Sequence, residues 1–249
     1  MRSEEFITSI MQTAKDNEKF EEVRRNIPIG KDSVGNIVVA QKRKGAVSLQ
    51  HTCVTGAHRV GFIKRLLITL SCLYEPSDAC FMVLSPRQSY GDLLRLNHMD
   101  VTVPYIRSKS DLALAKDTVR ELAQMYETGA QGYPKFFLVL DGLEELPECN
   151  ENNDFAEYRE FMDIAMRKNI EVISGIDLMK SIFSGYPGAF IGIGNCLITT
   201  TEKGKADVTY VSEDTSLTRP LPMNYPDQPT VAETITFLNA LSHSNEEGA

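Results

Sequence analysis

The stretch from Thr55 to Ile63 has the glycine spacing of a phosphate-binding loop. A strand-like run, LQHTCV, leads to Gly56, four residues separate Gly56 from Gly61, and an amphipathic helical segment follows. In a working loop of the form GxxxxGK[ST], backbone N–H groups surround the phosphates, the lysine contacts the outer ones and the hydroxyl binds magnesium. The spacing therefore points to nucleotide binding and phosphoryl transfer.

Two side chains of such a loop are replaced here by apolar ones. Phe62 stands in place of the lysine and Ile63 in place of the hydroxyl. Lys64 lies two residues beyond Phe62, about 200° around a helix axis, so we expect it to point away from the phosphates. The residues of this degenerate loop are Gly56, Ala57, His58, Arg59, Val60, Gly61, Phe62 and Ile63.

Two polar side chains remain in the loop, those of His58 and Arg59. Either could meet an anion, and an anion-binding or sensor module using Arg59 is one interpretation. The simpler interpretation, which we favour, is that both are solvated loop residues.

An acidic residue ends the apolar run Lys135–Leu140, which we expect to be a buried strand. That residue is Asp141, and Gly142 follows it. An Asp at the end of such a strand is the usual context for the residue that holds the magnesium of a bound nucleotide. Alternatively, Asp141 serves only as the N-cap of a short turn before Pro147.

The elements that must position these residues alternate along the chain. Apolar runs without polar alternation, separated by helical segments, predict an α/β fold with a mostly parallel sheet covered on both faces. Three short strands near 190–194, 195–201 and 206–211 predict an antiparallel edge, with a turn at 202–205. The expected main strands are 50–54, 80–84, 136–140 and 171–174, and the expected helices are 60–74, 88–97, 111–127 and 155–168.

We expect three parts along the chain. Residues 1–26 predict an amphipathic helix that docks on the core, or alternatively forms a seam to a preceding domain or a neighbouring chain. Residues 27–218 form the α/β domain. In 219–249, four prolines within ten residues predict a linker-like crossing, followed by a helix near 231–241 and a polar tail.

The composition is that of a soluble globular protein, with 42% hydrophobic and 24% charged residues. A formal net charge of -8 argues against DNA binding by this chain alone, because such binding depends on clustered positive charge. Five cysteines without CxxC spacing indicate a reducing compartment, and the four histidines lack metal-ligand spacing. No apolar run reaches the roughly 20 residues of a membrane span. We therefore expect a cytoplasmic protein without a metal, attached to a membrane only through a larger complex.

Four segments carry a likeness to a known family: IPIGKDSVGNIVVA at 27–40, the glycine loop, SCLY at 71–74 and FFLVLDGLEEL at 136–146. In order and spacing they resemble the motor domain of FtsK/SpoIIIE-type DNA translocases and the related ATPases of type VII secretion and conjugation. The likeness runs from Ile27 to Val211. It implies a RecA-like P-loop fold of the HerA/FtsK class and assembly into rings or strings of motor domains.

The resemblance also implies groups that this chain lacks. The family follows its acid with a Glu that polarises the attacking water, whereas this chain has Gly142, and Glu144 and Glu145 come too late to replace it. After the next strand the family has a Thr-Gln-Arg-Pro run, whereas this chain has SGID at 174–177. Because phosphoryl transfer depends on positioned charge, we expect no ATP hydrolysis, and weak or no ATP binding.

The sequence thus predicts a catalytically degenerate FtsK/SpoIIIE-like domain with no catalytic residue and no cofactor. Its expected role is a structural, regulatory or partner-binding module of a DNA- or protein-translocating machine, in contact with neighbouring motor domains. The alternative is an ATP-driven translocase motor, with ATP and magnesium, whose missing groups come from neighbouring subunits. For the acidic run at 144–154 we favour a solvated loop over a surface for a basic partner.

Overall fold

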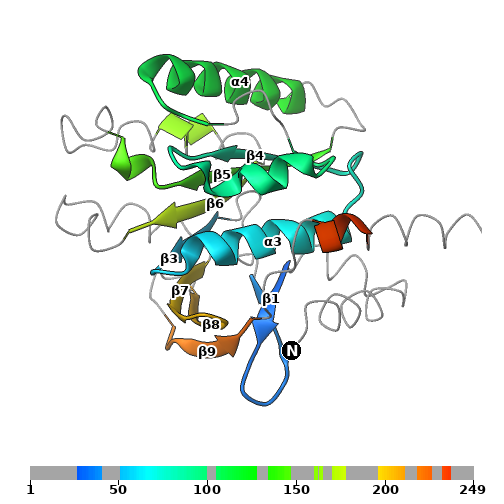
Figure 1. The fold of residues 1–249 in the computed structure, drawn as a ribbon, viewed down its shortest axis with the longest axis vertical. Coiled ribbons are helices and arrows are strands. Elements are labelled where there is room, and N and C mark those ends of the chain that lie inside the picture. Colours follow the sequence, from blue (N-terminus) through cyan, green and yellow to red (C-terminus); the bar gives the residue numbers. More distant parts are fainter. Residues whose placement is uncertain are drawn as a thin grey trace, which may run out of the picture.

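Nine strands of the described chain form one sheet, in the order β2-β1-β9-β8-β7-β3-β6-β5-β4, with helices packed against it (Figure 1). The computed structural model describes residues 27–40, 51–99, 105–127, 134–146, 160, 161, 163, 164, 170–177, 196–210, 218–225 and 232–236. The strands are β1 (Ile27–Lys31), β2 (Ile37–Ala40), β3 (His51–Thr55), β4 (Ala79–Leu84), β5 (Lys135–Asp141), β6 (Glu171–Ile176), β7 (Cys196–Glu202), β8 (Lys205–Tyr210) and β9 (Leu221–Asn224).

One half of the sheet is parallel and contains the four main strands expected from the sequence. β3 pairs with β6 and β7, while β5 pairs with β6 and β4, all in parallel register. Such strands read as continuous apolar runs because helices bury both of their faces. The predicted α/β class and the four strand positions are confirmed.

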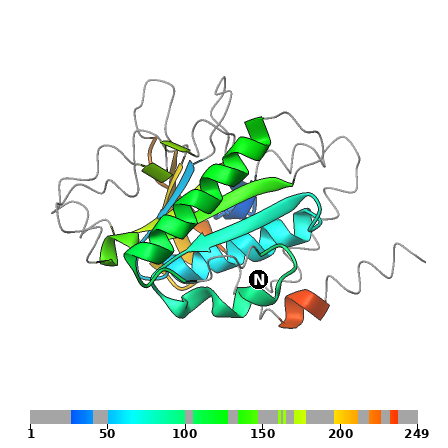
Figure 2. The ribbon, with the colours of Figure 1, turned by 90° about the horizontal axis from the view of Figure 1, so that it is seen from above.

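The side chains of β5 divide between two cores. Phe137 and Val139 pack in the core beneath α3 (Arg59–Leu73), and Phe136 and Leu138 pack in the core beneath α4 (Lys109–Glu127). Successive side chains of a strand point to opposite faces, so a run of apolar residues fills both cores at once. Figure 2 shows strands of the sheet lying between α3 and α4.

The helices lie close to their expected ranges. The predicted helix at 60–74 is α3, and the one at 111–127 is α4. At the start of α4, Asp111 accepts a hydrogen bond from the Arg107 N–H at 2.8 Å and donates its own N–H to Ser108 Oγ at 3.2 Å. These bonds satisfy N–H groups near the start of the helix. The segment expected as a helix at 88–97 is a 3-10 helix, η1 (Gln88–Arg95), and a second one, η2 (Leu143–Glu145), follows β5.

The other half of the sheet is antiparallel, and it is larger than expected. β8 pairs with β7 and β9, and β1 pairs with β9 and β2. Four parallel and four antiparallel pairings join the described strands, so the expectation of a mostly parallel sheet with a short antiparallel edge is wrong. The hairpin formed by β1 and β2 joins this half through β9, which the sequence did not indicate.

β9 lies where the prolines predicted an irregular crossing, so that part of the prediction is also wrong. Pro222 pairs with Asp207 of β8. A proline cannot donate a hydrogen bond to a neighbouring strand. On its other side, β9 meets β1 only at the pair of Lys31 and Asn224 within the described residues, so no strand there requires a donor from Pro222.

Some expected elements lie outside the described residues. These are the N-terminal helix of 1–26, the strand at 190–194 and much of the helices at 155–168 and 231–241; residues 160, 161, 163, 164 and 232–236 are helical. The division into 1–26, 27–218 and 219–249 stays a prediction.

Candidate functional site

The glycine loop and Asp141 meet at one edge of the sheet. β3 ends at Thr55, directly before the loop, and β5 ends at Asp141. Both strands pair in parallel with β6, which lies between them and ends at Ile176. The carboxyl ends of such strands are where α/β proteins bind ligands, so the two candidate segments occupy the expected edge.

The loop is shorter than its glycine spacing suggests, because α3 begins at Arg59. The Arg59 N–H donates to the carbonyl of Gly56 at 3.2 Å. The His58 N–H donates to Oγ1 of Thr200 at 3.2 Å, and that hydroxyl donates to the carbonyl of Thr55 at 2.7 Å. Two backbone donors that a phosphate would need are therefore bonded within the protein.

β7 lies directly against the loop at Gly56. Gly56 has φ +96°, and a Cβ there would overlap the carbonyl oxygen and the side chain of Thr200. The backbone conformation and the lack of space both require glycine. This glycine therefore serves the contact between the loop and β7, which gives it a structural role.

Phe62 and Ile63 are fully buried, each at 0% exposure. The Phe62 ring meets that of Tyr225 edge to face, with ring centroids 5.0 Å apart, and the Arg65 guanidinium lies over both rings. Ile63 lies beneath β6, where its Cδ1 is 2.8 Å from the position of a Cβ on Gly175. The two side chains that replace lysine and hydroxyl are thus core residues.

Arg59 contacts Asp141 directly. Its Nε donates to Oδ1 of Asp141 at 2.9 Å, and the side chains are 9% and 0% exposed. Burial alone would lower the pKa of Arg59, but the charges of Asp141, Glu144 and Glu145 raise it. Burial raises the pKa of Asp141, and Arg59 opposes this shift. The pair is a charge-assisted hydrogen bond in a largely water-free site.

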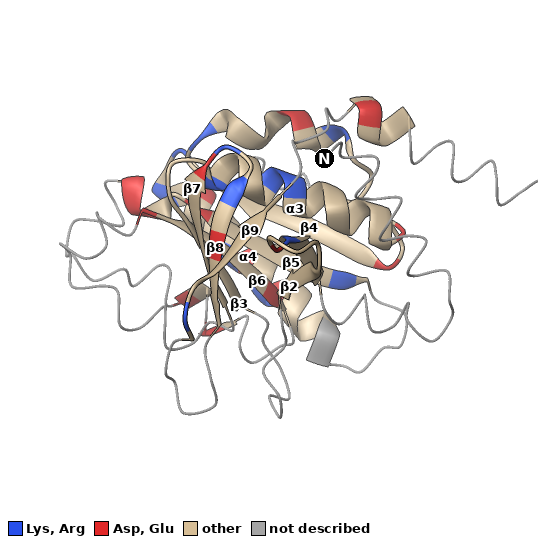
Figure 3. Ribbon diagram, turned by 90° about the horizontal axis from the view of Figure 1, so that it is seen from below, with Lys and Arg blue, Asp and Glu red and all other residues tan. Residues whose placement is uncertain are grey.

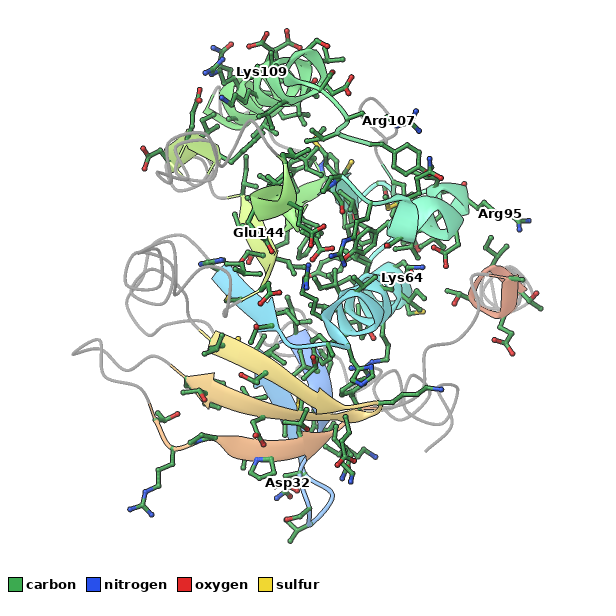
Figure 4. All side chains as sticks on the ribbon, turned by 60° about the vertical axis from the view of Figure 1, so that its left-hand side comes forward. Asp32, Lys64, Arg95, Arg107, Lys109 and Glu144 are labelled. Atoms are coloured by element: carbon green, nitrogen blue, oxygen red, sulfur yellow. The ribbon has the colours of Figure 1, made fainter. Side chains whose placement is uncertain are left out.

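A second set of groups surrounds this pair. Glu144 is buried and accepts a hydrogen bond from the Asp177 N–H at 3.0 Å, and Glu145 is held by Arg87, whose Nε lies 2.8 Å from its Oε2. Figure 4 shows Glu144 in the interior of the molecule, whereas Asp32 lies at the far end near the β1–β2 hairpin. These two glutamates of the acidic run are therefore occupied within the protein.

The Tyr90 hydroxyl completes the surroundings of Asp141 from η1. Burial raises the pKa of Tyr90 well above its usual range, and the charge of Asp141 adds to this effect. Its hydroxyl faces the carboxylate outside regular hydrogen-bond geometry. The acid thus has side chains of α3 and η1 as its neighbours.

Two interpretations of single residues are wrong. Arg59 is buried, not solvated, because the carboxylate of Asp141 attracts it inward; His58 is exposed, as expected. Asp141 does not cap the turn that follows it: Gly142 occupies the N-cap of η2 without a side-chain bond, and the Asp141 carboxylate accepts from Arg59. Lys64 points away from the loop, as expected, and its Nζ lies 2.7 Å from Oδ1 of Asp92.

The residues present do not fit a magnesium nucleotide. The positions of the lysine and hydroxyl are apolar and buried, two loop N–H groups are bonded within the protein, and Asp141 holds a guanidinium. Among the described residues, no group of three or more His, Cys, Asp or Glu side chains is arranged to hold a metal ion. The site therefore offers the phosphates no lysine and no hydroxyl in the usual places, and two of its loop N–H groups are already bonded.

The surface of the described chain carries both signs of charge. Figure 3 shows Lys and Arg beside Asp and Glu on the helices and on the antiparallel strands. On α4, for example, Arg120 pairs with Asp117 and with Glu160, and Lys116 also pairs with Glu160. None of the helices within the described ranges is long and apolar enough to cross a membrane.

The fold is similar to that of ATPase domains from type VII secretion motors. The cytoplasmic domain of the type VII secretion ATPase EccC of Thermomonospora curvata is 16% identical over 82% of this chain, with a TM-score of 0.56. EssC (ATPases 2 and 3) of Geobacillus thermodenitrificans is 14% identical over 90% of this chain, with a TM-score of 0.55. At these identities the likeness shows the fold, and the resemblance expected from the sequence is confirmed at that level.

The chain spans only part of these proteins, 29% of the EccC chain and 49% of the EssC chain. A structure of EccC (ATPases 2 and 3) in complex with a signal sequence peptide is 15% identical over 82% of this chain, with a TM-score of 0.55. No family model and no curated protein matches the sequence.

Sequence reasoning missed the partners of the loop. Thr200 lies in β7, which was expected as a strand but not beside the loop, and Tyr225 follows β9, which was not expected. The pairing of Arg59 with Asp141 carried a usable signal. One charge of each sign followed two strands expected to end at the same edge of the sheet, which places the two side chains within reach of each other.

Proposed function

We propose that this chain is an ATPase-like module that has lost turnover and acts as a structural, regulatory or partner-binding part of a translocation machine of the secretion or conjugation type. The observation that carries the proposal is the Arg59 guanidinium on Asp141. In a working site that acid would hold magnesium. Here its charge is balanced from within the protein.

The burial of Phe62 and Ile63 supports the same proposal. A lysine in place of Phe62 would have its charge in the core, next to Tyr225, and burying an unpaired charge is costly. Loss of the lysine, the hydroxyl and the water-polarising Glu removes groups that are each worth several powers of ten in rate. We accordingly assign no catalytic residue to this chain.

The fold likeness supports the place of the chain in a machine. One similar structure is the cytoplasmic domain of a type VII secretion ATPase. Two others contain ATPases 2 and 3 of EccC and of EssC, which are serial domains of one chain. A module of this size therefore has neighbouring motor domains as its natural partners, in a ring or string, and a cytoplasmic location. DNA contact by this chain alone is not part of the proposal, given its net charge of -8.

Calorimetric titration with magnesium-ATP tests the loss of nucleotide binding. We expect no saturable heat at micromolar protein, and no phosphate release above the buffer rate. A dissociation constant in the low micromolar range would contradict the proposal. Co-sedimentation with the ATPase domains of the motor encoded in the same genome tests the partner role, and no complex in the presence or absence of ATP would contradict it.

The second candidate is an ATP-driven DNA or protein translocase motor, favoured by the similarity to ATPase domains 2 and 3. A neighbouring subunit can supply an arginine to the outer phosphate, but a lysine within the phosphate loop must come from the loop itself. Magnesium-dependent ATP hydrolysis by the assembled complex, absent from the motor without this chain, would establish this candidate.

A further inference from the structure

The proteins of similar fold are ATPases, whereas the site of this chain is arranged around a guanidinium. Arg59 Nε lies 2.9 Å from Oδ1 of Asp141, and Nη2 lies 3.9 Å from Oε1 of Glu144 and 3.7 Å from Oε1 of Glu145. We propose that Arg59 is the resident cation of this site, an internal ligand whose guanidinium takes the place of a bound cation on Asp141. The inference goes beyond the proposed function, because it concerns what occupies the site and holds for any partner.

The geometry of the guanidinium fits this role. Arg59 is the first residue of α3, so its side chain starts at the loop and reaches across the end of β6 to β5. Its Nε donates to Asp141, and its Nη2 lies within ion-pair distance of the glutamates of η2 without a hydrogen bond to them. One side chain thus joins the start of α3 to the end of β5 and to η2, which follow it by 82 or more residues.

Burial makes the pair a closed unit. Arg59 and Asp141 are 9% and 0% exposed at their side chains, so the Asp141 charge has little access to water if the guanidinium is removed. Removing one member of a buried ion pair leaves an uncompensated charge and is strongly destabilising. The guanidinium is therefore a fixed part of the fold, held by Asp141, and is not available to an external ligand.

Gly175 makes room for the pair, and Gly142 lies next to it. Gly175 on β6 lets the Asp141 carboxylate lie directly against the strand, because a Cβ there would overlap Oδ1. Gly142 follows the acid, and the position of its Cβ is 3.5 Å from Nη2 of Arg59. A side chain at residue 142 would have the guanidinium as its first neighbour. The glycine after the acid and the arginine in the loop thus belong to one arrangement.

Thermal unfolding of the 249-residue chain with changed residues tests the inference. We expect Arg59→Ala to lower the Tm by about 10 °C, since it removes the guanidinium that pairs with the buried Asp141 carboxylate. Guanidinium chloride at millimolar concentration should restore part of this loss, whereas sodium chloride at the same ionic strength should not. The wild type and the double variant Arg59→Ala/Asp141→Asn should show no such gain. Lys64→Ala, which breaks a more exposed pair with Asp92, is the matched control and should change the Tm little.

An Arg59→Ala chain with the Tm of the wild type, or one that guanidinium does not stabilise more than sodium chloride does, would overturn the inference. If Arg59→Ala does not fold, Arg59→Gln and Arg59→Gln/Asp141→Asn decide the matter. The double variant should fold and exceed the single variant in Tm, because it removes both charges, and a double variant no better than the single one would also overturn the inference. Neither result depends on magnesium-ATP, so failure here and failure of the proposed function are distinguishable.

Discussion

The ring of Phe62 meets the ring of Tyr225 edge to face, with centroids 5.0 Å apart. This contact joins the first turns of α3 to the residue that follows β9, and Arg65 stacks over both rings at 5.2 and 4.6 Å. Edge-to-face aromatic pairs add about 0.5 to 1.5 kcal/mol beyond the area they bury. Phe62 stands where a working loop has its phosphate-binding lysine. Here it packs between the two halves of the sheet and helps to hold them together.

Restoring the loop motif should therefore cost stability without giving activity. We expect Phe62→Lys/Ile63→Thr to lower the free energy of unfolding by at least about 3 kcal/mol, since it removes a buried ring and places a charge in the core. Urea unfolding followed by circular dichroism measures the loss, and phosphate release measures activity. Phe62→Leu, which removes the ring but adds no charge, is the control and should cost less than the double variant. A stable double variant that hydrolyses ATP would contradict this prediction.

Gly175→Ala should destabilise the protein through Asp141. A Cβ at this position would overlap Oδ1 of the carboxylate and lie 2.8 Å from Cδ1 of Ile63, so the acid and the strand must move apart. We expect a loss of about 2 to 3 kcal/mol in the free energy of unfolding. Gly35→Ala is a matched control with φ +94° and no atom within 4 Å, and it should cost about 1 to 2 kcal/mol from backbone strain alone.

The role of the Asp141 carboxylate in the cost of Gly175→Ala can be tested separately. In an Asp141→Ala background the Cβ introduced by Gly175→Ala no longer meets a carboxylate, so the extra cost of this substitution should shrink, although the contact with Ile63 remains. An equal cost in both backgrounds would show that the carboxylate is not the obstacle.

Much of the parallel half was predictable from the sequence, and the reason is local. β3, β4, β5 and β6 are short apolar runs bounded by helices, and burial on both faces leaves no polar alternation to confuse the pattern. The antiparallel half was harder, because the pairing of β1 with β9 joins residues nearly two hundred positions apart through a single pair, Lys31 and Asn224. Local patterns carry no information about such a contact.

Prediction of the candidate site from the sequence was limited in the same way. The positions of the loop and of Asp141 followed from strand ends and were predictable. The burial of Arg59 was missed, because Arg59 was considered by itself as a loop residue and not together with Asp141, its partner at the same edge of the sheet. The bond from the His58 N–H to Thr200 of β7 was also not predictable, because it joins residues far apart in the sequence.

Arg65 should hold the N-terminal hairpin onto the rest of the sheet. It is 3% exposed, and its Nη2 donates to the carbonyl of Ile29 in β1 at 2.8 Å. We expect Arg65→Met, which keeps an apolar stem and removes the donor, to cost about 1 to 3 kcal/mol and to speed amide hydrogen exchange in β1 and β2 more than in β5. Arg95→Met is the control, because Arg95 is exposed on η1 and points outward (Figure 4). Uniform acceleration across all strands would contradict a local role.

Acid should destabilise the fold through His51. This residue is fully buried on β3, with Nε2 2.7 Å from Oγ of Ser174, and burial lowers the pKa of its imidazole from 6.5 to about 4. Between these values the unfolded chain binds a proton that the folded chain does not. The free energy of unfolding should therefore fall as the pH drops from 6.5 to 4, by up to about 3 kcal/mol, and stop falling from this cause below pH 4. Burial also lowers the pKa of His98, which adds in the same direction. Urea unfolding at a series of pH values measures the slope, and His51→Gln should reduce it while His58→Gln, at an exposed position, should not. A slope unchanged in His51→Gln would assign the acid sensitivity to other groups.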